Sequence, residues 1–105
     1  MKPVDTIHYN FEWSPVKARK NLKKHKISFE EAAEVFLDPL HFSMPDLEQP
    51  DNDERWITLG YSKAHKLNLV VHTFISYDDN NQVTIRVISA RSATKHEKKQ
   101  YEETK

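Results

Sequence analysis

Three apolar runs separated by short connections constrain the fold of this chain more than any other feature. The runs cover residues 55–61, 67–76 and 82–90, and their side chains alternate with the two-residue period of a β-strand. The connections, 62–66 and 77–81, have the length of turns. Consecutive strands joined by turns pair antiparallel. The sequence therefore predicts a three-stranded antiparallel meander.

Helices and two further strands are predicted around this meander, which makes an α+β fold. Ser14-Pro15 supplies an N-cap followed by proline at the first helical position. Residues 28–31 and 94–97 each form a capping box, which begins a helix. Asp38-Pro39 ends the second helix, because a residue before proline avoids helical geometry. The expected elements are strands at 7–13 and 40–44 and helices at 15–25, 29–37 and 94–103.

Alternation also divides the meander into two faces. One face is aliphatic, and we expect the helices to pack on it. The other face mixes Trp56, His72 and Arg86 with other residues, a combination that suits base stacking and phosphate binding. Alternatively, Trp56 and its apolar neighbours form a second small core under the C-terminal helix. The aliphatic set is Ile57, Leu59, Leu67, Leu69, Val71, Ile75, Val83, Ile85 and Val87.

Length and composition exclude several classes of protein. A chain of 105 residues corresponds to one domain, with a core expected over about residues 7–103. The chain has no cysteine, which excludes disulfides and thiolate ligands or nucleophiles. The first residues do not have the pattern of a secretory signal, and no apolar run approaches the ~20 residues that cross a bilayer. We expect a cytoplasmic protein without membrane contact.

The charges cancel in sum but are arranged in blocks. Residues 13–29 carry six Lys or Arg and no acid, whereas residues 30–54 carry nine acids and no Lys or Arg. A basic face for phosphates and an acidic face for a basic partner can therefore coexist. The alternative is that both blocks are ordinary solvated helix faces.

The residue types favour one kind of chemistry. The sequence has no Gly-rich phosphate loop, no nucleophile elbow and no histidine spacing typical of a metal site, so we predict no metal and no cofactor. Arg, Lys, His and Tyr suit RNA cleavage without metal, in which the 2′-hydroxyl attacks the adjacent phosphate. The protein then positions the strand, neutralises phosphoryl charge with arginine and moves protons with histidine.

A set of short motifs runs through most of the chain. They are Phe11-Glu12-Trp13, Lys17-Ala18-Arg19, Asn21-Leu22, Lys24-His25, residues 28–32 and 36–39, residues 54–57 with Gly60, residues 70–73, Ile88-Ser89-Ala90-Arg91, Ala93-Thr94 and Glu97. In this order and spacing they resemble the BrnT family of type II toxins, over about residues 9–103. The resemblance implies a RelE-like fold, an antiparallel sheet with helices packed on it. It also implies a ribonuclease that suppresses growth and is neutralised by a BrnA-type antitoxin, through which operator DNA is contacted only indirectly.

The resemblance also indicates site residues. Arg91 matches the arginine of the family's Ile-Ser-Ala-Arg motif, and Lys24-His25 matches its Lys-His pair. The alternatives are a structural salt bridge from Arg91 to Glu97 and a helix C-terminal position for His25. His72 has the alternative of a satisfied structural histidine, and Trp56 that of core packing. The predicted catalytic set is Arg91, Arg86, His72 and His25, and the predicted RNA-binding set is Lys24, Lys20, Trp56 and Tyr101, with Glu54 as a weaker candidate.

The nuclease hypothesis requires these cations to converge on one spot that grips a phosphodiester. Two departures from the family pattern lower the positive charge there: Ser92 replaces a second basic residue, and residues 74–79 extend a strand and add acid. A non-catalytic partner-binding or co-repressor module, such as a decayed toxin, is therefore the main alternative, and a sequence-specific DNA binder is the third hypothesis. The acidic block predicts that the antitoxin contacts Glu30, Glu31 and Glu34 through a basic segment.

Overall fold

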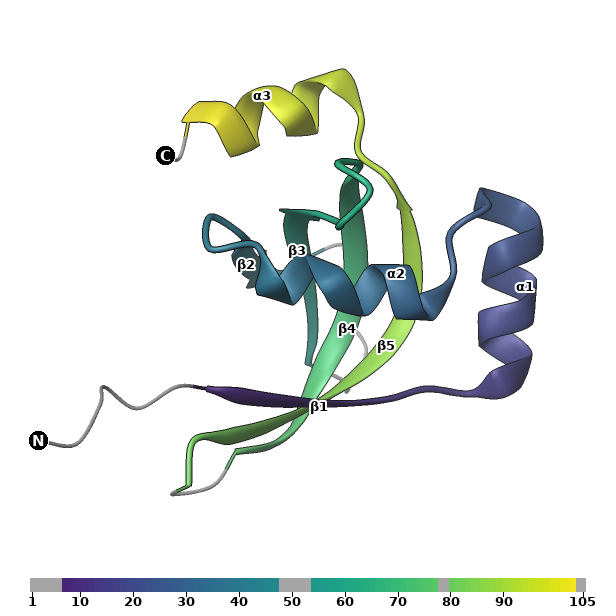
Figure 1. Cartoon of the computed structure of the whole chain (residues 1–105), viewed down its shortest axis with the longest axis vertical. Helices are drawn as coiled ribbons and strands as arrows, with labels where there is room; N and C mark the ends of the chain where they lie inside the picture. Colours follow the sequence, from purple (N-terminus) through teal and green to yellow (C-terminus); the bar gives the residue numbers. More distant parts are fainter. Residues whose placement is uncertain (1–6, 48–53, 78–79, 104–105) are drawn as a thin grey trace, which may run out of the picture.

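The predicted meander forms the centre of the structure. The computed structural model describes residues 7–47, 54–77 and 80–103, so residues 48–53 of the acidic block and residues 78–79 of the second turn lie outside the described part. Its elements in chain order are β1 (His8–Glu12), α1 (Pro15–His25), α2 (Phe29–Glu34), the 3-10 turn η1 (Val35–Leu37), β2 (Phe42–Pro45), β3 (Arg55–Tyr61), β4 (Leu67–Tyr77), β5 (Gln82–Ser92) and α3 (Lys95–Glu103). The strands form one sheet in the order β1-β5-β4-β3-β2 (Figure 1). The antiparallel pairing of β3, β4 and β5 confirms the meander.

The sheet is mixed, which corrects the expectation of a purely antiparallel one. β1 pairs parallel with β5, with Tyr9 beside Val83 and Phe11 beside Ile85. After β1 the chain passes through α1 and α2 and reaches the opposite edge of the sheet at β2, so that β1 and β2 occupy the two edges (Figure 1). The alternation that predicts a strand at 7–13 carries no information about the direction of its neighbour.

The helix boundaries follow the capping residues of the sequence. The Ser14 hydroxyl accepts a hydrogen bond from the backbone of Lys17, and the Ser28 hydroxyl accepts one from Glu31 (3.0 Å). The C-cap of α1 is Lys26, which adopts the left-handed conformation with φ 62°. The second helix narrows to a 3-10 turn before Asp38, and this turn lies close to the only glycine of the chain. A Cβ atom at Gly60 would meet the Val35 carbonyl oxygen at 2.8 Å, so only glycine allows this approach.

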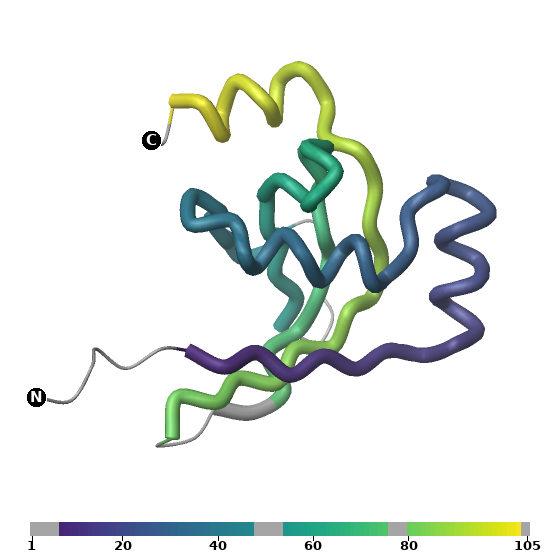
Figure 2. The backbone as a smooth tube through the Cα atoms, viewed as in Figure 1, coloured from purple at the N-terminus to yellow at the C-terminus, as the bar shows by residue number. Residues whose placement is uncertain are grey.

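α2 crosses one face of the sheet, and α1 lies beside the part of β5 that β1 does not pair with (Figure 2). We call the face under α2 the helix face and the other the open face. The core lies between α2 and the helix face. Its buried members are Ile27, Phe29, Ala32, Val35, Phe36, Val70, Val83, Ile85, Val87 and Ala90. None of the helices in the described part of the chain has the length and apolar content needed to span a membrane.

A β-bulge changes which side chains share a face, and the predicted aliphatic face is therefore wrong. Val71 pairs with Ser89 but His72 pairs with Val87, so Ile88 is an extra residue in β5. The bulge places Val83, Ile85 and Val87 on the helix face together with His72. Ile57 and Leu59 of β3 and Leu67, Leu69 and Val71 of β4 lie on the open face instead. The predicted aliphatic set is thus divided between the two faces.

α3 closes one end of the open face. Tyr101 is buried there with Leu59 and Leu69, and Phe42 and Tyr61 pack against this cluster. The Tyr101 hydroxyl donates a hydrogen bond to Asp38 Oδ2 (2.6 Å), which joins α3 to the end of η1. Among the residues that the structure describes, no helix covers the rest of the open face.

Candidate functional site

The predicted site residues do not converge. Arg86 and Arg91 lie on the open face, where their cross-strand partners are Thr73 and Leu69. His72 lies on the helix face, and His25 is the last residue of α1 beside the β5 edge. The prediction that all four meet at one phosphodiester is therefore wrong. The bulge at Ile88 and the helical cover of the other face are the physical reasons.

His72 is a core residue. Its side chain is 0% exposed, and its Nε2 atom lies 2.6 Å from Thr58 Oγ1. The rings of Phe36 and Phe74 pack edge-on against the imidazole, each with centroids 5.0 Å away. Burial, and to a smaller extent the nearby His41, lowers the pKa of His72 to about 4, so the ring is neutral at pH 7. This location matches the structural alternative, because a side chain that is 0% exposed presents no surface to solvent.

Trp56 and Tyr101, which the sequence predicts to bind RNA, pack against other aromatic side chains. Trp56 is half-buried on the helix face and packs edge-on against Phe74, with ring centroids 5.4 Å apart. Tyr101 is 2% exposed, and its hydroxyl is bound by Asp38. Burial alone would raise the pKa of Asp38, but hydrogen bonds from Tyr101 and from the backbone of Tyr61 and Leu40 hold it below its usual value. Both aromatic residues therefore have packing roles.

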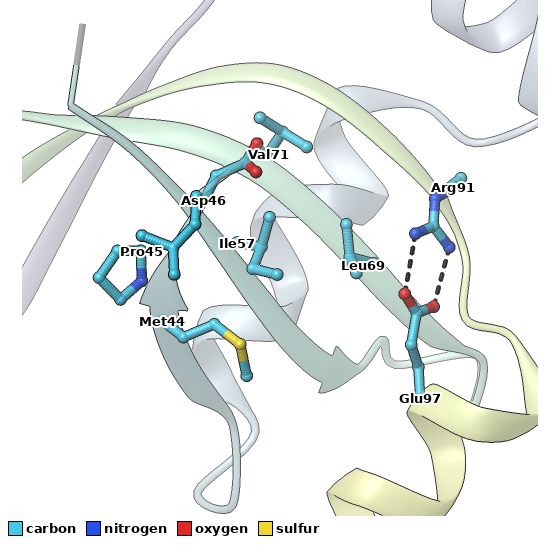
Figure 3. Close-up of a pocket in the computed structure, with 9 residues that line it drawn as sticks. Met44, Pro45, Asp46, Ile57, Leu69, Val71, Arg91 and Glu97 are labelled. Carbon is cyan, nitrogen blue, oxygen red and sulfur yellow. Dashed lines mark hydrogen bonds and ion pairs between the residues drawn. The ribbon is translucent and has the colours of Figure 1, made fainter. Parts of the chain in front are cut away.

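Arg91 borders a cleft of about 460 Å³ on the open face (Figure 3). Its guanidinium makes two parallel hydrogen bonds to the Glu97 carboxylate, both 2.8 Å long, and its side chain remains 40% exposed. The salt bridge left open by the sequence is thus present. The cleft is lined by Met44, Pro45, Asp46, Leu47, Ile57, Leu69, Val71, Arg91 and Glu97.

Glu97 fixes the arginine from the first turn of α3. The predicted capping box is confirmed, since the Thr94 hydroxyl accepts from the Glu97 backbone (3.1 Å) and Glu97 Oε1 accepts from the Thr94 backbone (2.9 Å). Hydrogen bonds from Arg91 lower the pKa of the Glu97 carboxyl below its usual value. The carboxylate is therefore ionised at neutral pH, and the guanidinium is fixed in direction but partly neutralised.

Two rows of side chains cross the open face from strand to strand. The first consists of Met44, Ile57, Val71 and Ser89, which are successive cross-strand partners in β2, β3, β4 and β5. The second consists of Arg55, Thr73 and Arg86. Arg86 lies 3.8 Å from the Glu12 carboxylate, and 55% of its side chain is exposed. Arg55 was not predicted as a site residue, although it has the same alternation as Ile57.

A basic groove lies between α1 and the β5 bulge. Its volume is about 360 Å³, and it is lined by Lys17, Lys20, Asn21, Lys24, His25, Ile88 and Ser89. The structure therefore brings together three predicted residues: Lys20, Lys24 and His25. Ser89 belongs both to this groove and to the first row of the open face.

Asn21 fixes the position of this groove. Its side chain amide donates to the Ala90 carbonyl (2.9 Å) and accepts from the Ala90 N–H (3.0 Å), as a neighbouring strand would. It also donates to the Ile27 carbonyl (3.0 Å). β1 pairs only with residues 82–86 of β5, so Asn21 satisfies the edge that β1 leaves open. Within the described residues, no group of three or more His, Asp or Glu side chains is placed to hold a metal ion.

Comparisons with known proteins bear on the family and the fold of the chain. Residues 13–97 match the model of a family described as the ribonuclease toxin BrnT of type II toxin–antitoxin systems. The fold is similar to the crystal structure of the Brucella abortus ribonuclease toxin BrnT, with a TM-score of 0.61 and 22% sequence identity. That likeness covers 84% of this chain and 99% of the other. No curated protein matches the chain in sequence.

Proposed function

This chain belongs to the BrnT family of ribonuclease toxins of type II toxin–antitoxin systems, and from that premise we propose that it is a metal-independent endoribonuclease acting on the open face of its sheet. The observation that carries the proposal is the cleft beside Arg91. A partly exposed guanidinium, fixed in direction, borders an apolar floor that includes Ile57, Leu69 and Val71. Guanidinium groups bind phosphate, and apolar floors accept unstacked bases.

The proposed reaction uses the RNA's own nucleophile. The 2′-oxygen attacks the adjacent phosphorus and loses its proton, and the bond from phosphorus to the 5′-oxygen breaks. The departing 5′-oxygen gains a proton, which leaves a 2′,3′-cyclic phosphate and a 5′-hydroxyl. Arg91 stabilises the charge on the phosphoryl oxygens, with Arg86 and Arg55 on the neighbouring row. Water accepts the proton of the 2′-hydroxyl and returns one to the departing 5′-oxygen, because His25 lies in the groove beside α1 and not in the cleft beside Arg91.

The proposed partner is a BrnA-type antitoxin that masks the toxin in the cytoplasm and links it to operator DNA. A RelE-like relationship of the fold remains part of this proposal. Glu30 on α2 is exposed, whereas Glu31 accepts from Asn68 and Glu34 accepts from the Lys63 backbone. We therefore expect Glu30→Lys to slow association with a basic antitoxin segment more than changes at its two neighbours.

The test of the function is direct. The purified chain is incubated with RNA in the presence of a chelator, and fragments are analysed for 2′,3′-cyclic phosphate ends. We expect cleavage by the native chain and its loss in Arg91→Ala. The pairing of Arg91 with Glu97 favours the alternative of a non-catalytic partner-binding module. Intact RNA with the folded native chain, together with tight antitoxin binding, would establish that alternative.

A further inference from the structure

We infer that the substrate is single-stranded RNA that runs across the strands, from the Arg91 cleft over β5 into the basic groove of α1. This inference rests on the proposed function and adds a path and a strand class to it. The path is defined by the first row of the open face, Met44, Ile57, Val71 and Ser89.

The row connects the two hollows without a break. Ile57 and Val71 line the cleft, and Ser89 lines the groove. Val71 of the cleft and Ser89 of the groove are direct cross-strand partners, so these two lining residues are one strand spacing apart, about 4.8 Å. An RNA strand that lies in the cleft and crosses β5 therefore enters the groove directly.

The groove has the charge that an RNA backbone requires. Lys17, Lys20 and Lys24 are spaced by three and four residues, so they lie on one face of α1. None of the residues lining the groove is acidic. The bulge residue Ile88 supplies an apolar wall beside the three ammonium groups.

Arginines flank the path where it crosses the sheet. Arg86 and Arg55 lie on the neighbouring row on one side, and Arg91 lies on the other side, opposite Leu69. The path itself is apolar through Met44, Ile57 and Val71. Bases stacked inside a duplex would not reach this apolar floor, whereas unstacked bases would. The arrangement of an apolar path with cations on both sides therefore fits a single strand.

The test compares binding of short and long strands. The probes are 2′-O-methyl uridine oligonucleotides of about three and about nine nucleotides, which cannot be cleaved and whose lengths bracket a small site. For the native chain we expect the long probe to bind about tenfold more tightly than the short one, about 1.4 kcal/mol. In the groove variant, Lys20→Gln/Lys24→Gln, we expect this gain in affinity from short to long probe to disappear, while the affinity for the short probe stays unchanged. The slope of log affinity against log salt falls by about 1.4, because each single-strand phosphate contact contributes about 0.7.

The matched control is Lys98→Gln/Lys99→Gln, which removes two exposed lysines from α3 and should leave the gain unchanged. Three outcomes would overturn the inference: the groove variant keeps the gain, it weakens short and long probes equally, or the native chain binds a duplex as tightly as the single strand. Cleavage of unmodified RNA is measured separately. If the native chain cleaves RNA but the groove variant binds the long probe as tightly as the native chain does, the proposed path is wrong and the proposed function stands. If binding depends on probe length but no RNA is cleaved, the ribonuclease proposal is wrong.

Discussion

Buried polar side chains lie on the helix face, whereas Arg86 and Arg91 on the open face keep contact with solvent. His72 and Thr58 are both 0% exposed and lie within hydrogen-bond distance of each other. Arg86 and Arg91 pair with Glu12 and Glu97, but their side chains remain 55% and 40% exposed. The same sheet thus stabilises the fold on one side and presents charge on the other. Chemistry near a substrate is expected only on the second side.

The largest expected effect separates the two faces by activity. Arg91→Ala should lower the rate of RNA cleavage by about 10²–10³-fold, since a preorganised donor to a developing charge contributes about 3–4 kcal/mol. Its effect on stability should be small, because a partly exposed ion pair contributes about 1 kcal/mol or less. The measurement is initial cleavage rate beside urea unfolding. Arg91→Lys should also be impaired, since an ammonium lacks the two-pronged geometry.

The matching variant on the helix face is His72→Gln, which should keep its cleavage rate at pH 7 once the folded fraction is taken into account. An inactive but fully folded His72 variant would contradict the division of roles between the faces. So would an Arg91→Ala variant that cleaves RNA at the native rate.

The next largest effect is a pH dependence of folding stability that arises from His72 on the helix face. The pKa of His72 is about 4 in the folded chain, against about 6.5 for an unperturbed histidine. Between these values the unfolded chain binds the extra proton, so stability falls as the pH decreases from about 6.5 to about 4. The loss over that window is roughly 3 kcal/mol. Urea midpoints measured across the window should show it, and His72→Gln should show a flatter profile.

The carboxyl groups contribute at lower pH and in the same direction. The pKa values of Asp38 and Glu97 are held below their usual range, so the stability that they supply is present above the unfolded pKa. It is lost as the pH falls below the unfolded pKa values and through the lower folded values. A pH profile of His72→Gln that still falls steeply between about 6.5 and 5 would show that a different group titrates there.

Local signals in the sequence account for the elements but not for the faces. Ser14, Ser28 and Thr94 cap the helices as predicted, because capping is decided within four residues. Arg86 and Arg91 are an odd number of residues apart, so strict alternation puts them on opposite faces. The bulge puts both on the open face, and Ile88 carries no local sign of it. The parallel partner of β1 is likewise decided by the path of the whole chain.

The sequence predicts the local parts of the site but not their arrangement, because the arrangement depends on contacts between distant segments. Lys20 and Lys24 are four residues apart on α1, so their meeting in a groove follows from helical spacing, whereas the place of His25 in the groove does not. Their position relative to Arg91 depends on how α1 packs against β5. The hydrogen bonds between the Asn21 side chain and the Ala90 backbone fix that packing. Asn21 belongs to a family motif, but nothing in its sequence context shows that its partner lies in β5.

Asn21 therefore joins the two regions, and its removal should weaken both. Asn21→Ala leaves the Ala90 N–H and C=O unpaired at a buried position, which should cost about 2–3 kcal/mol of folding free energy. Because the bonded segment carries Ser89 and Arg91, cleavage by the folded fraction should also fall. Asn21→Asp is the sharper variant: its carboxylate still accepts from the Ala90 N–H but repels the Ala90 and Ile27 carbonyls. Full activity in a destabilised Asn21→Asp chain would show that the contact is structural only.

The smallest expected effect tests whether α3 holds the open face in shape through a single bond. Tyr101→Phe keeps the ring stacked near Phe42 and removes only the hydroxyl that donates to Asp38 (2.6 Å). A hydrogen bond to a charged group contributes about 1.5 kcal/mol, so the urea midpoint should fall modestly. Asp38 keeps its backbone donors from Tyr61 and Leu40, so its carboxylate is not left unpaired. Glu97 lies one turn earlier on the same helix, and the Arg91 pair should survive because the Thr94 cap is independent of Tyr101. Cleavage should therefore stay within about twofold of the native rate, roughly 0.4 kcal/mol. A large loss of activity without a loss of stability would instead place the Tyr101 hydroxyl among the groups that act on RNA.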